Sequence, residues 1–139
     1  MILNEKKGNL FELDNEKYFF AHCISSDYAL GVGIAVEFQK RFKLRDNLKK
    51  YSSGKYPELI TINNIFNLVT KEKYWHKPTY NSLTTCIRYM RDMCRNCDIK
   101  YLAMPKIGCG LDRLSWPKVR EIIKEEFKDL DIEIEVRYL

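Results

Sequence analysis

The chain has 139 residues, of which 45% are hydrophobic and 31% are charged, and its formal net charge is +5. This length fits one domain, residues 1–139, which buries enough apolar surface to fold without a metal or a disulfide. The N-terminal stretch is charged and too short for a signal peptide, and no run reaches the roughly 18 apolar residues of a membrane span. We therefore expect a soluble cytoplasmic monomer with no membrane association.

The cysteines predict a reduced chain without a metal. Their number is odd, and reduced thiols are typical of a cytoplasmic protein. Cys94 and Cys97 have the Cys-x-x-Cys spacing, but no second pair of cysteines or histidines completes the four ligands of a zinc site. We expect no metal and no cofactor. The five cysteines are Cys23, Cys86, Cys94, Cys97 and Cys109.

In the first half of the chain, strands alternate with helices. Residues 1–13 predict an edge strand followed by a turn at 7–9. Residues 18–24 are almost all apolar, which is typical of a strand buried on both faces. A loop with two glycines leads from this strand into a helix that places apolar side chains at i, i+4 and i+8. The glycines are Gly31 and Gly33, and the apolar helix residues are Ile34, Phe38 and Phe42.

The second half continues the alternation. Residues 45–56 are basic and polar and predict a short helix that ends at 52–54. Residues 59–62 and 65–70 predict a hairpin. After a polar and aromatic loop at 71–77, Pro78 opens a long helix with an apolar stripe. The stripe is Leu83, Ile87, Met90 and Cys94. A strand at 101–104, a helix at 116–127 beginning after Ser115, and a terminal strand at 132–138 follow. This order predicts an α/β fold with a mixed sheet between helix layers.

The loop between strand 101–104 and helix 116–127 is the best candidate for a binding site. It contains Gly108, Gly110 and Asp112. Glycine allows the backbone to approach a ligand closely, and successive N–H groups in such a loop bind phosphate. Two glycine-containing loops follow strand ends, where open α/β sheets bind ligands. We expect one phosphate-rich ligand across both loops, although a Gly-x-Gly turn alone also fits a tight connection.

Several other residues have two possible interpretations. His22 lies inside an apolar strand and is predicted to be a hydrogen-bonded core residue. His76 either orients its neighbour Lys77 or is an exposed loop residue. Cys109 could suggest a thiol nucleophile, but compact packing explains it better. Residues 40–55 carry seven Lys or Arg, which indicates either a solvated face or contact with nucleic acid.

Four motifs occur in an order that resembles macrodomains: His-Cys-Ile-Ser at 22–25, Gly-Val-Gly-Ile-Ala at 31–35, His-Lys-Pro-Thr-Tyr at 76–80, and residues 104–114. The similarity extends from Gly8 to Leu139. It is most specific to the terminal ADP-ribose protein glycohydrolase subgroup, also called the O-acyl-ADP-ribose deacylases. The antitoxin macrodomain that removes ADP-ribose from DNA is similar. The resemblance implies a three-layer α/β/α macrodomain with a central mixed sheet.

What the resemblance implies for function is an ADP-ribosyl hydrolase that releases ADP-ribose from acidic side chains, O-acyl groups or nucleobases. Its partners would be ADP-ribose and ADP-ribosylated protein or nucleic acid. In the family pattern Lys77 is the nucleophile and Asp112 the acid/base. The implied ligand-binding residues are Asn9, Leu10, Cys23, Ser25, Gly31, Gly33, Ile34, Ala35, Pro105, Lys106, Ile107, Gly108, Cys109, Gly110, Leu111 and Leu139.

Two positions depart from the family pattern. Asn9 stands where the family commonly has aspartate, and a neutral amide with its own donor changes how adenine would be recognised. Lys106 replaces a common arginine, so the charge stays but the planar geometry is lost. A reader that binds ADP-ribose without turnover is the alternative, against which the presence of both Lys77 and Asp112 argues. A general nucleic-acid-binding domain would show strong salt dependence and no preference for ADP-ribose.

Overall fold

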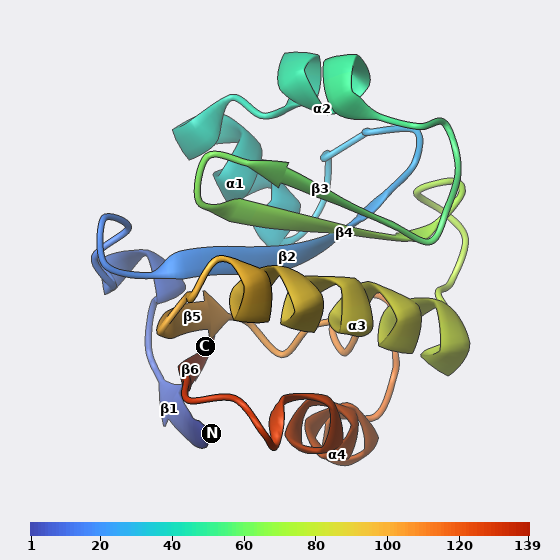
Figure 1. Ribbon diagram of the computed structural model, residues 1–139. Coiled ribbons are helices and arrows are strands. Elements are labelled where there is room, and N and C mark those ends of the chain that lie inside the picture. Colours follow the sequence, from blue (N-terminus) through green and yellow to red (C-terminus); the bar gives the residue numbers. More distant parts are fainter.

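The computed structural model describes residues 1–139 and shows a six-stranded sheet between two groups of helices (Figure 1). The strand order is β1-β6-β5-β2-β4-β3. Neighbouring strands are parallel except β3, which is antiparallel to β4. The predicted α/β fold with a mixed sheet is therefore confirmed. The strands are β1 (Ile2–Lys7), β2 (Phe19–Ser25), β3 (Glu58–Ile62), β4 (Ile65–Lys71), β5 (Tyr101–Met104) and β6 (Glu133–Tyr138).

Helices cover both faces of the sheet. The elements are η1 (Leu10–Glu12, a 3-10 turn), α1 (Ile34–Phe42), α2 (Arg45–Tyr51), α3 (Tyr80–Asn96) and α4 (Trp116–Phe127). Side chains of α3 and α4 pack in one cluster of 20 buried residues, and η1, α1 and α2 contribute to a second cluster of 14. The apolar stripe predicted for the long helix is fully buried, so its assignment is confirmed. No helix is long and apolar enough to cross a membrane.

The start of the long helix and the end of strand β4 differ from the predicted boundaries. The long helix begins at Tyr80 rather than at Pro78, because the Thr79 hydroxyl accepts a hydrogen bond from the Ser82 N–H at 3.0 Å and forms a capping box with Ser82. Strand β4 includes Lys71, one residue beyond the predicted end. Ser115 occupies the cap position of α4 but makes no capping bond with its side chain.

His22 is a core residue, as predicted. It is fully buried, lies 2.6 Å from the Asn67 side-chain oxygen through its Nε2, and stacks on Phe38 with ring centroids 3.9 Å apart. Burial lowers the pKa of His22 to about 4, although the Asn67 contact opposes this effect. His22 therefore stabilises the β2–β4 pair as a neutral side chain.

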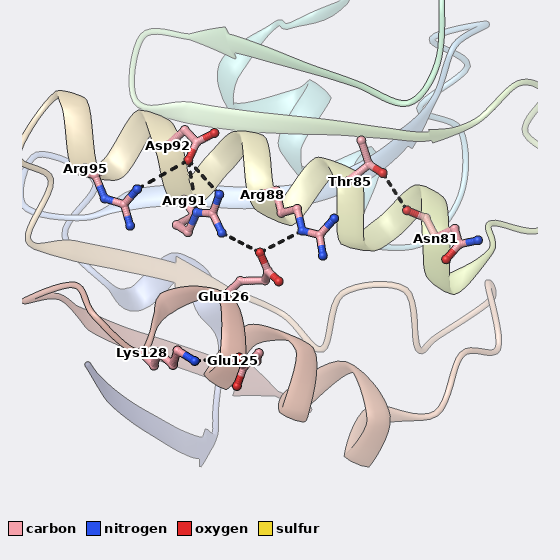
Figure 2. A network of polar contacts seen from close by, with 9 residues as sticks. All are labelled: Asn81, Thr85, Arg88, Arg91, Asp92, Arg95, Glu125, Glu126 and Lys128. Atoms are coloured by element: carbon pink, nitrogen blue, oxygen red, sulfur yellow. Dashed lines mark hydrogen bonds and ion pairs between the residues drawn. The ribbon is translucent and has the colours of Figure 1, made fainter.

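A polar network joins α3 to α4 (Figure 2). The Glu126 carboxylate accepts from Arg88 Nε at 3.0 Å and from Arg91 Nη1 at 2.7 Å, and Arg91 also contacts Asp92. None of the residues predicted for the site takes part in it. The network thus connects the two helices of one layer outside the predicted site.

Five parallel strands end at the same edge of the sheet, since parallel strands share one direction. Strand β2 ends at Ser25, β4 at Lys71, and β5 at Met104 just before Pro105. The ends of β1 and β6 lie side by side, with the Gly8 N–H donating to the Tyr138 carbonyl at 2.8 Å. All the segments predicted to contact a ligand follow or end these strands, so the fold gathers them along one edge.

Candidate active site

Asp112 is held by a lysine that the sequence did not single out. The Lys71 ammonium lies 2.6 Å from Asp112 Oδ1, and the two side chains are only 13% and 15% exposed. Lys71 ends β4, whereas Asp112 lies in the loop after β5, and β2 stands between these two strands. The long Lys71 side chain therefore extends past the end of β2 to reach the Asp112 carboxylate. An amine and a carboxylate this close can exchange a proton.

Lys77 occupies a neighbouring position. Its ammonium donates to the Leu111 carbonyl at 2.5 Å, and the residue is exposed. The expected contact between Lys77 and Asp112 is thus replaced by the Lys71–Asp112 pair, because the strand end points Lys71 at the carboxylate. The catalytic role of Lys77 stays a prediction. The sequence offered one signal for Lys71, since it directly follows the predicted strand at 65–70. Its register partner Ser25 in β2 is visible only in the structure.

The two glycine-containing loops approach each other. A Cβ built on Gly33 would lie 3.7 Å from Leu111 Cδ1, and Gly33 has φ +62° and ψ −150°, which glycine alone adopts readily. Gly108 has φ +73°, and a Cβ there would lie 3.1 Å from Leu114 and 3.2 Å from Leu83. Gly31, Gly33 and Gly110 are exposed, so these backbones are open to a ligand.

Asp27 ties the loop after β2 to the loop after β4. Its carboxylate accepts from the Ser25 hydroxyl at 2.5 Å, the Tyr74 N–H at 3.0 Å and the Ala29 N–H at 3.2 Å. Burial opposes ionisation of Asp27, but these three donors outweigh it and lower the pKa of the carboxyl. The sequence interpretation missed this residue, although Ser-Ser-Asp after a strand is a frequent turn signal. Asp27 therefore fixes the position of Ser25.

The two cysteines of the site are neutral thiols. Burial raises the pKa of Cys109 to about 11, and its thiol donates to the Ile107 carbonyl at 3.2 Å. Burial also raises the pKa of Cys23, which lies close to the Gly108 backbone. Because the thiolate is the nucleophilic form, neither residue is poised for attack. The packing interpretation of Cys109 is the one that its surroundings support.

The other predicted ligand-binding residues differ in their burial and in the contacts that their side chains already make. Leu10 and Ile107 are 3% and 2% exposed as whole residues and pack in the two cores, so their side chains are not open to a ligand. Asn9 Oδ1 accepts from the Phe11 N–H at 3.0 Å and caps η1. The Lys106 ammonium lies 4.0 Å from the Tyr138 ring centre, beside the exposed Leu139. Ile34, Ala35 and Pro105 are half-buried.

Comparison with known proteins defines the class. The sequence model of the Macro domain family matches residues 48–123. The chain is 42% identical over 135 residues to the ADP-ribose glycohydrolase OARD1 of Homo sapiens, with 94% of this chain and 87% of the relative covered. The chain therefore belongs to the macrodomain family, and the fold expected from the resemblance is confirmed.

More distant relatives share the fold. The DNA ADP-ribosyl glycohydrolase of Thermus aquaticus is 22% identical over 144 residues, covering 94% of this chain and 39% of that protein. The macrodomain of Thermus aquaticus DarG superimposes with a TM-score of 0.83 at 21% identity, each chain being 99% covered. The macrodomain of Mycobacterium tuberculosis DarG gives 0.87 at 16% identity, with 99% and 98% covered.

Proposed function

We propose that this macrodomain is an ADP-ribosyl hydrolase, which removes ADP-ribose from acidic side chains, O-acyl groups or nucleobases. The similarity to proteins named ADP-ribose glycohydrolase over most of the chain supports this activity. The single observation that carries the mechanism is the Lys71–Asp112 pair beside two exposed glycine-containing loops. These loops would hold the diphosphate through backbone N–H groups, so that the distal ribose lies against the pair.

In the proposed reaction Lys71 is the nucleophile and Asp112 is its proton acceptor. Asp112 takes a proton from the Lys71 ammonium, and the amine lone pair then attacks the anomeric carbon of the distal ribose. The bond from this carbon to the acceptor breaks, and the acceptor leaves with the electron pair. A proton moves from the attached nitrogen to the ring oxygen as the ring opens to a protonated Schiff base. Water adds to the carbon of this Schiff base, and the carbon–nitrogen bond then breaks. The departing Lys71 amine takes one proton from Asp112 and one from the water, and the other proton of the water goes to solvent. ADP-ribose and the unmodified acceptor are the products.

Lys77 is the competing candidate for the nucleophile. Its bond to the Leu111 carbonyl orders the loop that carries Asp112, and its exposed ammonium can also attract the diphosphate. Lys71 is favoured because it is the amine in direct contact with the carboxylate. The two assignments make opposite predictions for single substitutions, so they can be separated.

The test compares wild type with Lys71→Ala, Lys77→Ala and Asp112→Ala on glutamate-linked and thymidine-linked ADP-ribose. We expect release of ADP-ribose by wild type, a smaller but measurable rate for Lys77→Ala, and none for the other two variants. Full turnover by Lys71→Ala would remove it from the mechanism. Tight binding of ADP-ribose by wild type without any release would instead identify a reader.

A further inference from the structure

The loop after β2 presents a run of backbone N–H groups that have no acceptor within the protein. The N–H groups of residues 30–35 make no hydrogen bond to the chain, whereas the next N–H, that of Val36, donates to the Gly33 carbonyl at 3.2 Å. Consecutive N–H groups at the start of a helix bind anions. This loop is one of the two that would hold the diphosphate, so the direction in which its peptides point decides how well it binds.

Two residues other than glycine are strained in this loop. Tyr28 has φ +54° and Leu30 has φ +46°, and both are 7% exposed. A left-handed conformation is unfavourable for L-residues with bulky side chains, and it persists only where surrounding contacts hold it. The loop therefore needs a restraint from outside.

Arg45, the first residue of α2, supplies this restraint from the helix that lies beside the loop (Figure 1). Its Nε donates to the Tyr28 carbonyl at 3.0 Å, and its Nη2 donates to the Ala29 carbonyl at 2.6 Å. Leu48, which is fully buried, anchors α2 in the core. The Asp27 carboxylate accepts from the Ala29 N–H at 3.2 Å, so both backbone polar groups of Ala29 are held.

These contacts fix which way the peptide between Ala29 and Leu30 faces. In this trans peptide the C=O and the N–H point in opposite directions. Because the Ala29 carbonyl points at Arg45, the Leu30 N–H, the first of the unpaired run, points away from Arg45. A flip of the peptide would rotate φ of Leu30 by about 180°, into the β region that leucine favours. The flip would also replace the N–H by a carbonyl oxygen, which repels a phosphate.

We propose that Arg45 is a positioning residue for ADP-ribose binding, which holds the Ala29–Leu30 peptide with its N–H toward the diphosphate. This inference rests on the proposed function, because it takes the two glycine-containing loops to be the ADP-ribose site. Arg45 acts through the loop backbone and not on the reacting atoms. Its two neighbouring nitrogens form a rigid fork that suits two consecutive carbonyls, a geometry that a lysine ammonium does not reproduce.

The first test measures the affinity of the intact protein for ADP-ribose by calorimetry. We expect Arg45→Met to weaken binding about ten-fold, because one charge-assisted hydrogen bond to the diphosphate is lost. Arg45→Lys should recover part of this loss. The matched control Lys49→Met removes the same charge from an exposed position of the same helix and should bind as wild type does. Equal affinities of wild type and Arg45→Met, or equal losses in Arg45→Met and Lys49→Met, would overturn the inference.

A second readout follows the Leu30 amide directly, by NMR of protein that contains isotope-labelled leucine. ADP-ribose should shift the Leu30 amide signal of the wild type strongly and that of Arg45→Met much less. A wild-type Leu30 signal that ADP-ribose does not move would overturn the inference without any variant, so this test holds even if Arg45→Met fails to fold.

Turnover separates the inference from a purely structural role and from the hydrolase proposal. On a glutamate-linked substrate, Arg45→Met should raise KM about ten-fold and change kcat less than about two-fold, because the Lys71–Asp112 pair is left intact. A lower melting temperature with unchanged KM would show that Arg45 only stabilises the fold, and would reject the inference. If wild type binds ADP-ribose but releases none, the hydrolase proposal alone fails, and the affinities of wild type and Arg45→Met still support or overturn the role of Arg45.

Discussion

The Lys71 ammonium and the Asp112 carboxylate lie 2.6 Å apart at the edge of the sheet, although the two residues are 41 positions apart in the sequence. Both side chains are mostly withdrawn from water. Because both charges have lost much of their water, removing either partner would leave the other largely desolvated and unpaired, which costs free energy. The predicted chemistry depends on this one contact.

Replacing Lys71 by arginine should keep the ion pair and abolish turnover. A guanidinium does not lose its proton in proteins and is a poor nucleophile, so the charge and the carboxylate contact remain while attack becomes impossible. We expect ADP-ribose binding by calorimetry to change little and the release rate to fall at least about 100-fold. Measurable turnover by Lys71→Arg comparable to wild type would show that the amine is not needed.

Replacing Asp27 by asparagine should weaken the contact between the loop after β2 and the loop after β4. The amide oxygen can still accept from Ser25 and Ala29, but the amide nitrogen would face the Tyr74 N–H, donor against donor. Hydrogen bonds to charged groups contribute about 1.5–3 kcal/mol, so the 72–77 loop should exchange its amide protons faster by hydrogen exchange. Ser26→Ala, which removes only the bond to the Glu72 carbonyl, is the control and should act more weakly.

Gly108→Ala should destabilise the protein by about 1–3 kcal/mol, since an L-residue at this φ is strained. The added methyl group would also press on Leu114 and Leu83. Gly110→Ala provides the matched control in the same loop, because nothing lies within 4 Å of its built Cβ. Urea unfolding of both variants measures the difference. Equal midpoints for the two variants would refute the assigned conformation of Gly108.

The protein should lose stability as the pH falls from about 6.5 to about 4. Burial lowers the pKa of His22 from 6.5 to about 4. Between these two pH values the unfolded chain binds a proton at His22 and the folded chain does not. This interval corresponds to about 3 kcal/mol of unfolding free energy, present above pH 6.5 and lost progressively below it. Urea unfolding at pH 7.5, 5.5 and 4.5 checks the trend. His22→Leu should be less stable at pH 7.5 and should show a flatter pH profile.

Most of the fold was predictable from the sequence because the buried strands and the apolar stripe of α3 are long, periodic signals. The helix start near Pro78 was misplaced because a Thr79–Ser82 capping box decides it. The Lys71–Asp112 contact could not be derived from spacing, since it depends on β2 lying between β4 and β5. The Asp27 contacts likewise join loops that only the strand order brings together.

The most direct measurement is to trap the reaction with cyanoborohydride while ADP-ribosylated substrate is being turned over, and to map the modified lysine by peptide mass spectrometry. Reduction of a Schiff base leaves a stable secondary amine on the nucleophile. The account predicts the adduct on Lys71, retained in Lys77→Ala and absent in Lys71→Ala. An adduct on Lys77 in the wild type, or turnover that leaves no lysine modified, would contradict it.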